Sequence, residues 1–329
     1  MFNQTTNSPT KTIKKNLFLF LKIGISFGLI YWLFDKIAFS TVYKHLQSFD
    51  PIYLLPLVGL GLMGIFISVW KWSLLLNQAH QPHKFTFLLT LFWTGLFFNN
   101  FLPGRTGGDL VKVYGLTKKI KNASLATLSV LLDRALNLIA LIAIGTSSFL
   151  WVRPKEFLQL NITIPPTIVL WATLIIVPVT ISLLFFPKLK KWIHLQLNNL
   201  KVFGTSPTHL VFIFGLALIY QATMIFIHVI ASLGLGQQIE ILNFFYLIPL
   251  TAIVTLLPIS LNGIGLREGS FAILFTQMGV APAESAIAIS LTVTVFTMAL
   301  SLVGGGIHLA STRNWNLDHE TPPISQIPG

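Results

Sequence analysis

The sequence predicts an all-α polytopic membrane protein with about six spanning helices and two re-entrant helical hairpins. Of its 329 residues, 53% are hydrophobic and only 10% are charged, and the mean hydropathy is +0.75. Apolar segments of about 20 residues recur, and each is long enough to cross the hydrocarbon layer of roughly 30 Å as a helix. A soluble core could not bury this much apolar surface, so the bilayer is predicted to be the solvent.

The N-terminal segment, residues 1–15, is polar and basic, and an apolar run from Leu17 to Phe34 follows it. A signal peptide begins in the same way. This run is longer than a signal-peptide core, however, and no small-residue cleavage pattern precedes Asp35. It is therefore predicted to be a retained first span, with the basic segment in the cytoplasm.

Six segments are apolar and long enough to span the membrane: 17–35, 52–76, 123–151, 165–186, 208–233 and 284–310. They predict a single polytopic membrane domain over residues 16–312. A polar C-terminal tail, residues 313–329, follows that domain.

Two further apolar stretches, 85–102 and 241–261, each run into a cluster rich in glycine and proline. The clusters read LPGRTGGD (102–109) and LPISLNGIGLREG (257–269). If the first stretch crossed the membrane, five basic residues would face outward against Asp109 alone, which the excess of Lys and Arg in cytoplasmic loops disfavours. Those residues are Arg105, Lys112, Lys118, Lys119 and Lys121.

Loop charges therefore favour two re-entrant hairpins, over 85–121 and 241–281, that enter from opposite leaflets. Each hairpin precedes a long span, which is the internal symmetry of an inverted repeat. The basic loop at 187–207 then lies in the cytoplasm, together with both termini and with Lys71, His80, His83 and Lys84. The alternative is two ordinary spans, which gives eight crossings and moves the basic loop at 188 outside.

The two clusters also predict a polar cavity, because non-helical backbone at membrane depth needs surrounding protein or water. Glycines let backbone N–H groups approach an anion, and the planar fork of arginine suits phosphate. The candidates are Asn99, Asn100, Arg105, Gly107, Gly108 and Asp109 in the first hairpin, and Asn262, Gly263, Gly265, Arg267 and Glu268 in the second. Alternatively, glycine and proline only make the turns, and each arginine forms a local ion pair.

Asp133 and Arg134 lie about ten residues into the span that begins near Ala123, and hence near mid-bilayer. A charge at that depth costs about 2.5 to 3.5 kcal/mol, so it normally faces a partner or a wet cavity. Arg134 and Asn137, three residues apart, share a helix face. The pair is either a cation that awaits an anionic headgroup or an internal link that pins helices together.

Several other chemistries lack sequence support. There is no cysteine, and the 8 histidines show no H-E-x-x-H spacing, so no metal is expected. No phosphate-binding loop occurs, so neither ATP nor another cofactor is expected. The net charge of +12 lies in short basic tracts beside apolar segments, which is typical of membrane topology and argues against nucleic acid.

Three motifs resemble one family: NNFLPGRTGGDLVK (99–112), SVLLDR (129–134) and LPISLNGIGLRE (257–268). Over roughly residues 15–312, the chain is similar to the lysylphosphatidylglycerol synthase transmembrane-region family, also called flippase-like domain proteins. That family includes the membrane half of the bacterial multiple peptide resistance factor, which moves aminoacylated phosphatidylglycerol between leaflets. The first motif commonly reads Gly-Glu there, whereas this chain has Gly108-Asp109. Because only a short tail follows the last span, the aminoacyl-transferase activity is not expected.

The resemblance implies a flippase-like protein of the bacterial cytoplasmic (inner) membrane that binds an anionic phospholipid or lipid-linked headgroup. In this hypothesis the arginines meet the phosphate, the acids hold the guanidiniums, and the asparagines contact the headgroup or cap the broken helices. The residues are Arg105, Arg134 and Arg267, then Asp109, Asp133 and Glu268, then Asn99, Asn100 and Asn262. Two alternatives stay open: an intramembrane enzyme with Asp109 or Glu268 as base, and an accessory subunit that serves a separate lipid-modifying enzyme.

Overall fold

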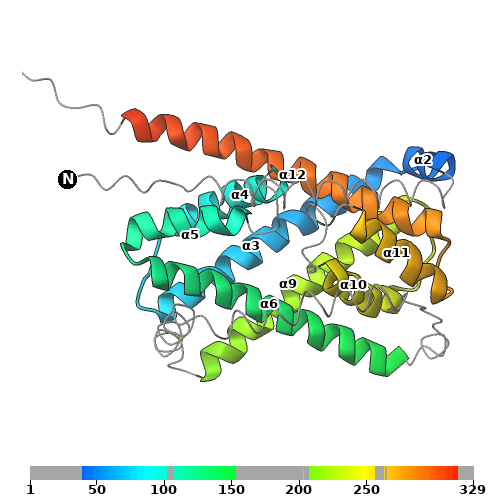
Figure 1. The fold of residues 1–329 in the computed structure, drawn as a ribbon, viewed down its shortest axis with the longest axis horizontal. Coiled ribbons are helices and arrows are strands. Elements are labelled where there is room, and N and C mark those ends of the chain that lie inside the picture. Colours follow the sequence, from blue (N-terminus) through cyan, green and yellow to red (C-terminus); the bar gives the residue numbers. More distant parts are fainter. Residues whose placement is uncertain are drawn as a thin grey trace, which may run out of the picture.

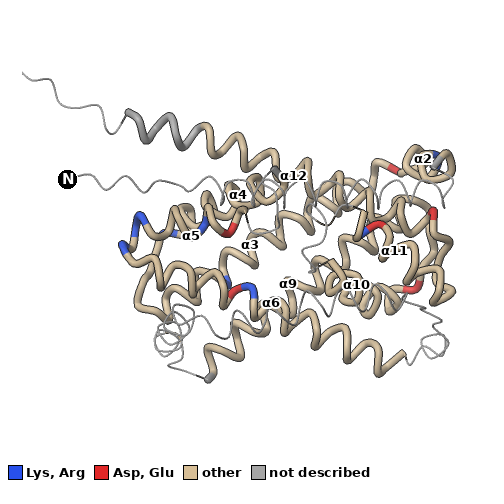
Figure 2. The backbone as a smooth tube through the Cα atoms, viewed as in Figure 1, with Lys and Arg blue, Asp and Glu red and all other residues tan. Residues whose placement is uncertain are grey.

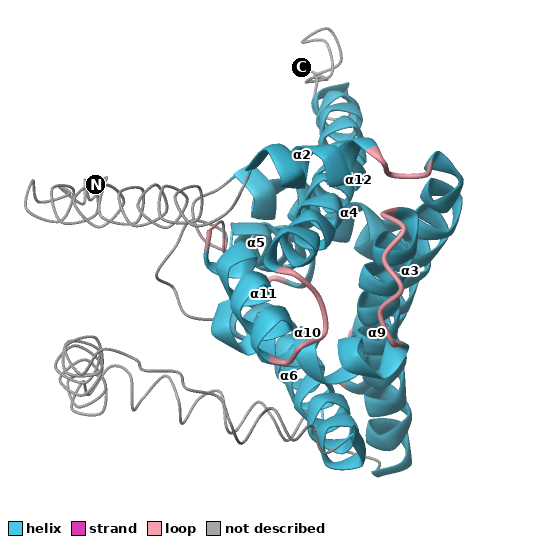
Figure 3. Ribbon diagram, turned by 90° about the vertical axis from the view of Figure 1, so that its right-hand side faces the viewer, coloured by secondary structure: helices cyan, strands magenta, loops and turns pink. Residues whose placement is uncertain are grey.

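The computed structural model describes residues 39–101, 107–152, 203, 207–255, 263 and 265–317. Every regular element in these residues is helical, as Figure 3 shows. The elements are α2 (Phe39–Gln47), η1 (Pro51–Tyr53), α3 (Leu54–Gln78), α4 (Phe85–Phe101), α5 (Gly107–Ile120), α6 (Ala123–Val152), α9 (Pro207–Gly234), α10 (Ile241–Thr255), α11 (Leu266–Gln277) and α12 (Ala283–Leu317). The predicted spans at 17–35 and 165–186 lie outside the described residues.

Four helices are long and apolar enough to cross a membrane: Pro51–Gln78, Ala123–Val152, Thr208–Gly234 and Ala283–Leu309. They coincide with four of the predicted spans. One of them, α6, has 30 residues and extends about 45 Å at 1.5 Å per residue. The prediction of an all-α polytopic membrane protein is therefore confirmed.

The two predicted hairpins are pairs of short helices that pack against each other, α4 with α5 and α10 with α11. Their second members, α5 and α11, have 14 and 12 residues. At 1.5 Å per residue these helices extend about 21 and 18 Å, which is less than the hydrocarbon layer of roughly 30 Å. The lengths favour broken hairpins over eight full spans, and re-entry from opposite leaflets stays a prediction.

The described helices repeat one order, long helix, short hairpin, long helix, first in α3–α6 and then in α9–α12 (Figure 1). The two leading helices, α3 and α9, pack side by side (Figure 3). The closing helix of each half packs on the hairpin of the other half, α6 on α10 and α12 on α4. This exchange is the arrangement expected of two interlocked repeats.

Glycines in α12 and α6 allow these helices to approach α4 and α10 closely. A Cβ atom on Gly304 of α12 would lie 2.0 Å from the carbonyl oxygen of Trp93 in α4. On Gly145 of α6 it would lie 2.7 Å from Cβ of Pro249 in α10. Trp93 and Pro249 stand at the same place in their helices, eight residues after Phe85 and Ile241 respectively. The two halves therefore use the same small-residue contact at equivalent positions.

Each half also has its own apolar core. One cluster of buried side chains gathers α3, α4, α5 and α6, with Trp72, Leu88 and Leu116 among its members. A larger cluster gathers α9 to α12, with Phe244 and Phe271 among its members, and it also includes Val42 of α2 and Leu57 of α3. The polar groups described next lie beside these cores, where an unpaired charge is costly.

Candidate functional site

An ion pair joins the first hairpin to the long helix after it. The guanidinium Nε of Arg134 in α6 meets the carboxylate of Asp109 in the first turn of α5. The Asp109 side chain is 15% exposed, whereas that of Arg134 is 42% exposed. Arg134 therefore lies at the surface of the helix bundle, twelve residues into a 30-residue span, with its carboxylate partner behind it.

A second ion pair lies deeper and joins α3 to α6. Lys71 is fully buried, and its ammonium lies 3.1 Å from an Asp133 carboxylate oxygen. The same ammonium donates a hydrogen bond to the side-chain oxygen of Asn137 and lies 5.3 Å from the ring centroid of Tyr220. Gln221 of α9 donates to the Asn137 carbonyl at 2.6 Å. This network links three long helices at membrane depth.

Lys112 is a third buried cation, and it has a different kind of neighbour. Its ammonium lies 3.8 Å from the ring centroid of Phe92 and 5.8 Å from that of Trp72. With these two rings, Val130 and Asp133, it lines a small recess between α3, α4, α5 and α6. The recess therefore combines one cation and one carboxylate with aromatic and aliphatic walls.

The predicted asparagines of the first hairpin make structural hydrogen bonds. Asn99 in α4 accepts the backbone N–H of Gly108 at 2.7 Å, and so satisfies an N–H group in the first turn of α5. Asn100 donates to the hydroxyl of Ser301 in α12 at 2.7 Å. Gly107 and Gly108 are both buried, and Gly108 is packed against Gly95 of α4. Of the two roles predicted for Asn99, the contact supports the helix cap.

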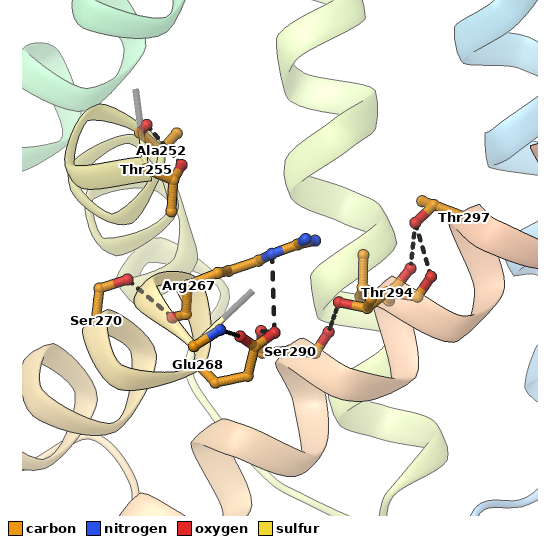
Figure 4. Close-up of polar contacts among 10 residues, drawn as sticks. Ala252, Thr255, Arg267, Glu268, Ser270, Ser290, Thr294 and Thr297 are labelled. Atoms are coloured by element: carbon orange, nitrogen blue, oxygen red, sulfur yellow. Dashed lines mark hydrogen bonds and ion pairs between the residues drawn. The ribbon is translucent and has the colours of Figure 1, made fainter. Parts of the chain in front are cut away.

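Glu268 organises the second hairpin by turning back on its own helix (Figure 4). Its carboxylate accepts the backbone N–H of Gly265 at 2.8 Å and the Ser290 hydroxyl of α12 at 3.4 Å. Gly263 and Gly265 have φ values of 81° and 79°, a left-handed conformation that glycine adopts at no steric cost. Glu268 therefore caps α11 from its third helical position.

Arg267 is only loosely paired. Its Nε lies 3.9 Å from a Glu268 oxygen, and this buried nitrogen has no hydrogen bond to another described residue. Figure 4 shows the side chain extending out from α11 above Glu268. The guanidinium thus extends away from its helix and lacks the close carboxylate contact that Arg134 has.

Figure 2 marks charged residues around α5 and α6 and, apart from these, at α11, and it also marks others at α2. One face of α12 runs between the two hairpins. Its Ser290 contacts Glu268, and its Ser301 contacts Asn100. Thr294 and Thr297 lie between them at helical spacing, so a stripe of hydroxyl groups connects the hairpins.

The ion pairs differ from those predicted from the sequence. Asp133 contacts Lys71 and not Arg134, because consecutive residues on a helix point in directions about 100° apart. Arg134 takes Asp109 instead. Arg105 and Asn262 lie outside the described residues, and no contact brings Arg134 and Arg267 together in the described part of the chain.

Sequence reasoning missed two of the charged side chains. The count of basic residues assigns Lys71 and Lys112 to cytoplasmic loops, but both are buried in helices, at 0% and 9% exposure. Lys71 lies within the predicted span 52–76, so the signal that could have found it is a single charge in an apolar run. Lys112 could have been found as the lysine one helical turn after Asp109.

The fold and the buried charges define a class, a polytopic helical membrane protein with an ionic site inside its bundle. Among the described residues, no group of three or more His, Cys, Asp or Glu side chains could hold a metal ion. The family model described as the lysylphosphatidylglycerol synthase TM region matches residues 19–305, and the chain belongs to this family.

A curated relative aligns with a smaller part of the chain. A UPF0104 membrane protein of Methanothermobacter thermautotrophicus is 29% identical over 79 residues. The aligned stretch makes up 23% of this chain and 22% of that protein, so it spans less than a quarter of either. No solved structure matches the chain. The family is named for the membrane part of a phospholipid-modifying enzyme, which connects the chain with lipids.

Proposed function

We propose that this protein binds the anionic headgroup of a membrane phospholipid and moves it between the leaflets. One observation carries the proposal: three cations, Lys71, Lys112 and Arg134, cluster with only two carboxylates, Asp109 and Asp133, in the described part of a membrane-embedded bundle. Charges at this depth are expensive unless they serve a partner or a substrate. An anionic headgroup is the substrate that such a cluster suits.

Entry of the headgroup from the lipid phase follows from the exposure of Arg134. Its side chain is 42% exposed, while the Lys71 side chain behind it is fully buried. A lipid next to α5 and α6 would meet the guanidinium first, and the planar fork of arginine binds phosphate oxygens in pairs. The acyl chains would stay in the bilayer as the headgroup enters.

The hydroxyl stripe on α12 ties one hairpin to the other through buried hydrogen bonds. Ser290 and Ser301, at its two ends, are eleven residues apart, which is about 16 Å along a helix. That distance is roughly half the hydrocarbon thickness. The stripe therefore holds the two hairpins about half a membrane thickness apart along α12.

The contacts of the two acids favour transport over intramembrane catalysis. Asp109 is ion-paired with Arg134, and Glu268 accepts hydrogen bonds from Gly265 and Ser290. Each acid thus holds a neighbouring group in place, which suits a supporting role. We propose orienting roles for both acids, and we place the protein in the cytoplasmic membrane with both termini in the cytoplasm.

Lipid exchange in liposomes tests the proposed function. Purified protein is reconstituted with fluorescent phosphatidylglycerol, and a membrane-impermeant quencher reports how fast the probe changes leaflet. Wild type is expected to exchange the probe faster than empty liposomes, with or without an imposed proton gradient. Arg134→Lys keeps the charge but loses the bidentate fork, so exchange is expected to fall by about tenfold.

Two controls complete the experiment. Lys119→Arg changes an exposed residue of α5 without changing charge, so it is expected to match wild type. Mass spectrometry of the recovered lipid is expected to show unchanged chemistry, whereas a modified headgroup would favour the enzyme alternative. Wild-type exchange no faster than that of empty liposomes, across several anionic headgroups, would remove the proposal.

A further inference from the structure

We propose that Asp133 is a carboxylate switch, which exchanges its partner between Lys71 on α3 and Lys112 on α5. In the structure the carboxylate pairs with Lys71 and so ties α6 to α3. In the second arrangement it pairs with Lys112 and ties α6 to the first hairpin. This exchange is a property of the helix bundle and does not depend on which molecule the protein transports.

The ion pair in the structure leaves the carboxylate of Asp133 incompletely satisfied. Its Oδ1 lies 3.1 Å from the Lys71 ammonium, but this buried oxygen accepts no hydrogen bond from any described residue. The separation is that of an ion pair, whereas the angles are not those of a hydrogen bond. Because a buried oxygen without a donor costs free energy, Asp133 gains from a partner that approaches it with better geometry.

Lys71 has other partners besides the carboxylate. Its ammonium donates a hydrogen bond to the side-chain oxygen of Asn137 and lies 5.3 Å from the ring centroid of Tyr220. One helical turn before the carboxylate, Nε1 of Trp72 in α3 donates to the Ser129 hydroxyl of α6 at 3.2 Å. Two hydrogen bonds therefore keep α3 and α6 joined when the carboxylate turns away.

Lys112 is the cation that is available to Asp133. Both side chains line the recess between α3, α4, α5 and α6, which has no space for a water molecule. The Lys112 ammonium has no carboxylate within ion-pair distance among the described residues and lies 3.8 Å from the ring centroid of Phe92. A ring face is a weaker partner for an ammonium than a carboxylate is. The nearby carboxylate of Asp109 already holds Arg134.

The two arrangements contain the same charges and differ only in which lysine holds the carboxylate. Both lysines are buried, at 0% and 9% exposure. Without the carboxylate, Lys71 keeps the Asn137 amide and the Tyr220 ring. Lys112 without the carboxylate keeps the Phe92 ring, as in the structure. Each arrangement thus leaves one lysine with neutral partners, which brings the two close enough in energy to form a two-state element.

The switch links α3 to the position of the first hairpin. Arg134, the neighbour of Asp133 in α6, holds Asp109 of α5, so α6 has one tie to the hairpin in the structure. Pairing of Asp133 with Lys112 adds a second tie to α5 and releases the ionic tie to α3. The hairpin and α3 therefore compete for one carboxylate.

A double-mutant cycle on the detergent-solubilised full-length protein tests whether either lysine can hold Asp133. Lys71→Met and Lys112→Met each leave one lysine, so each is expected to lower the apparent unfolding temperature by only about 1 to 4 °C. The double variant leaves a buried carboxylate with neither lysine, so it is expected to unfold at least about 10 °C below wild type. Additive losses would overturn the switch.

Further variants keep the cycle decisive if the double variant does not fold. Asp133→Asn, added to the double variant, removes the stranded charge and is expected to restore folding; failure to restore it would contradict the switch. Lys119→Met makes the same change at an exposed site of α5, and its loss is expected to add to that of Lys71→Met. A loss in Lys71→Met alone as large as in the double variant would show that Lys112 cannot replace Lys71.

The exchange itself is measured on the wild type by side-chain nuclear magnetic resonance of isotope-labelled lysine in micelles. Lys71 and Lys112 are each expected to give two signals or one signal broadened by exchange, whereas Lys119 gives a single sharp signal. Asp133→Asn is expected to remove the exchange at both buried lysines. Single sharp signals from both in wild type, or exchange that persists in Asp133→Asn, would overturn the switch.

The switch and the proposed function can fail separately. If wild-type liposomes exchange lipid but the stability losses are additive, the switch is wrong and the proposed function stands. If the double variant loses more than the sum and the lysine signals show exchange, the switch stands even where wild-type liposomes exchange no lipid, and then the proposed function is wrong.

Discussion

The two hairpins share a sequence pattern but use their acids in opposite ways. In the second hairpin, Glu268 turns back to the N–H of Gly265 and caps its own helix. In the first, Asp109 reaches outward to Arg134 on the next helix. There the cap comes from Asn99 on the preceding helix, which accepts the N–H of Gly108.

This difference shows how one pattern can serve two purposes. A helix start needs an acceptor for its free N–H groups. Where the neighbouring helix supplies that acceptor, as Asn99 does, the acid in the first turn is free to hold a cation. In the second hairpin the acid of the first turn is itself the acceptor, so it is used as the cap. We infer that the first hairpin is suited to ligand binding and the second to holding its own shape.

The largest expected effect concerns the side of the membrane from which each hairpin enters. The chain has no cysteine, so single cysteines can be introduced without background. Lys119→Cys, at the end of the first hairpin, is expected to react only with reagent added from the cytoplasm. Gln238→Cys, before the second, is expected to react only from outside. Labelling of both sites from one side would break the inverted relation between the hairpins.

The next prediction compares the packing of the two hairpins. A Cβ atom on Gly108 would lie 1.9 Å from the carbonyl oxygen of Gly95, so Gly108→Ala cannot be accommodated without moving a backbone. We expect a loss of about 3 kcal/mol in stability or failure to fold. A Cβ atom on Gly269 in α11 would have no neighbour within 4 Å, so Gly269→Ala is the matched control.

Thermal unfolding of purified protein, followed by size-exclusion chromatography, measures both glycine variants. Gly269→Ala is expected to unfold within about a degree of wild type or slightly above it, because alanine is a better helix former than glycine. Equal stability of the two variants would show that the close approach of α4 and α5 is not required.

The helical fold could be predicted from the sequence because spanning helices depend on length and apolarity, and the helices α3, α6, α9 and α12 follow those two properties. The contacts between side chains inside the bundle could not be predicted from the sequence. Asp133 and Arg134 are adjacent in sequence, yet they face different helices, and the lysine that pairs with Asp133 lies 62 residues earlier, at Lys71. Such pairs depend on how α3 packs on α6, which hydropathy does not encode.

Replacing Glu268 and Asp109 in turn is expected to distinguish an acid that stabilises the fold from an acid that is needed for transport. Glu268 is 5% exposed, and Glu268→Ala leaves the Gly265 N–H without its acceptor, so we expect a loss of about 1 to 3 kcal/mol. Asp109→Ala takes the Asp109 carboxylate away from Arg134. The Arg134 side chain is 42% exposed and can be hydrated, so stability is expected to fall by less than about 1 kcal/mol.

Lipid exchange at matched protein content is expected to rank these two variants in the opposite order. Asp109→Ala loses the group that orients Arg134, whereas the folded fraction of Glu268→Ala keeps the first hairpin intact. Exchange that falls more in Glu268→Ala than in Asp109→Ala, after correction for folded protein, would move the ligand site to the second hairpin.

The smallest expected effect concerns the hydroxyl stripe that ties both hairpins to α12. Asn100 donates to Ser301 at 2.7 Å, whereas Ser290 donates to Glu268 at 3.4 Å, close to the limit of a hydrogen bond. Ser301→Ala is therefore expected to lower stability by about 1 kcal/mol, and Ser290→Ala by about half as much. Both hydroxyls are buried, at 2% and 0% exposure, so burial does not explain the difference. Thermal unfolding of the two variants measures it. A larger loss for Ser290→Ala would mean that the cap of the second hairpin depends on α12, and that Glu268 is held from outside its own helix as Asp109 is.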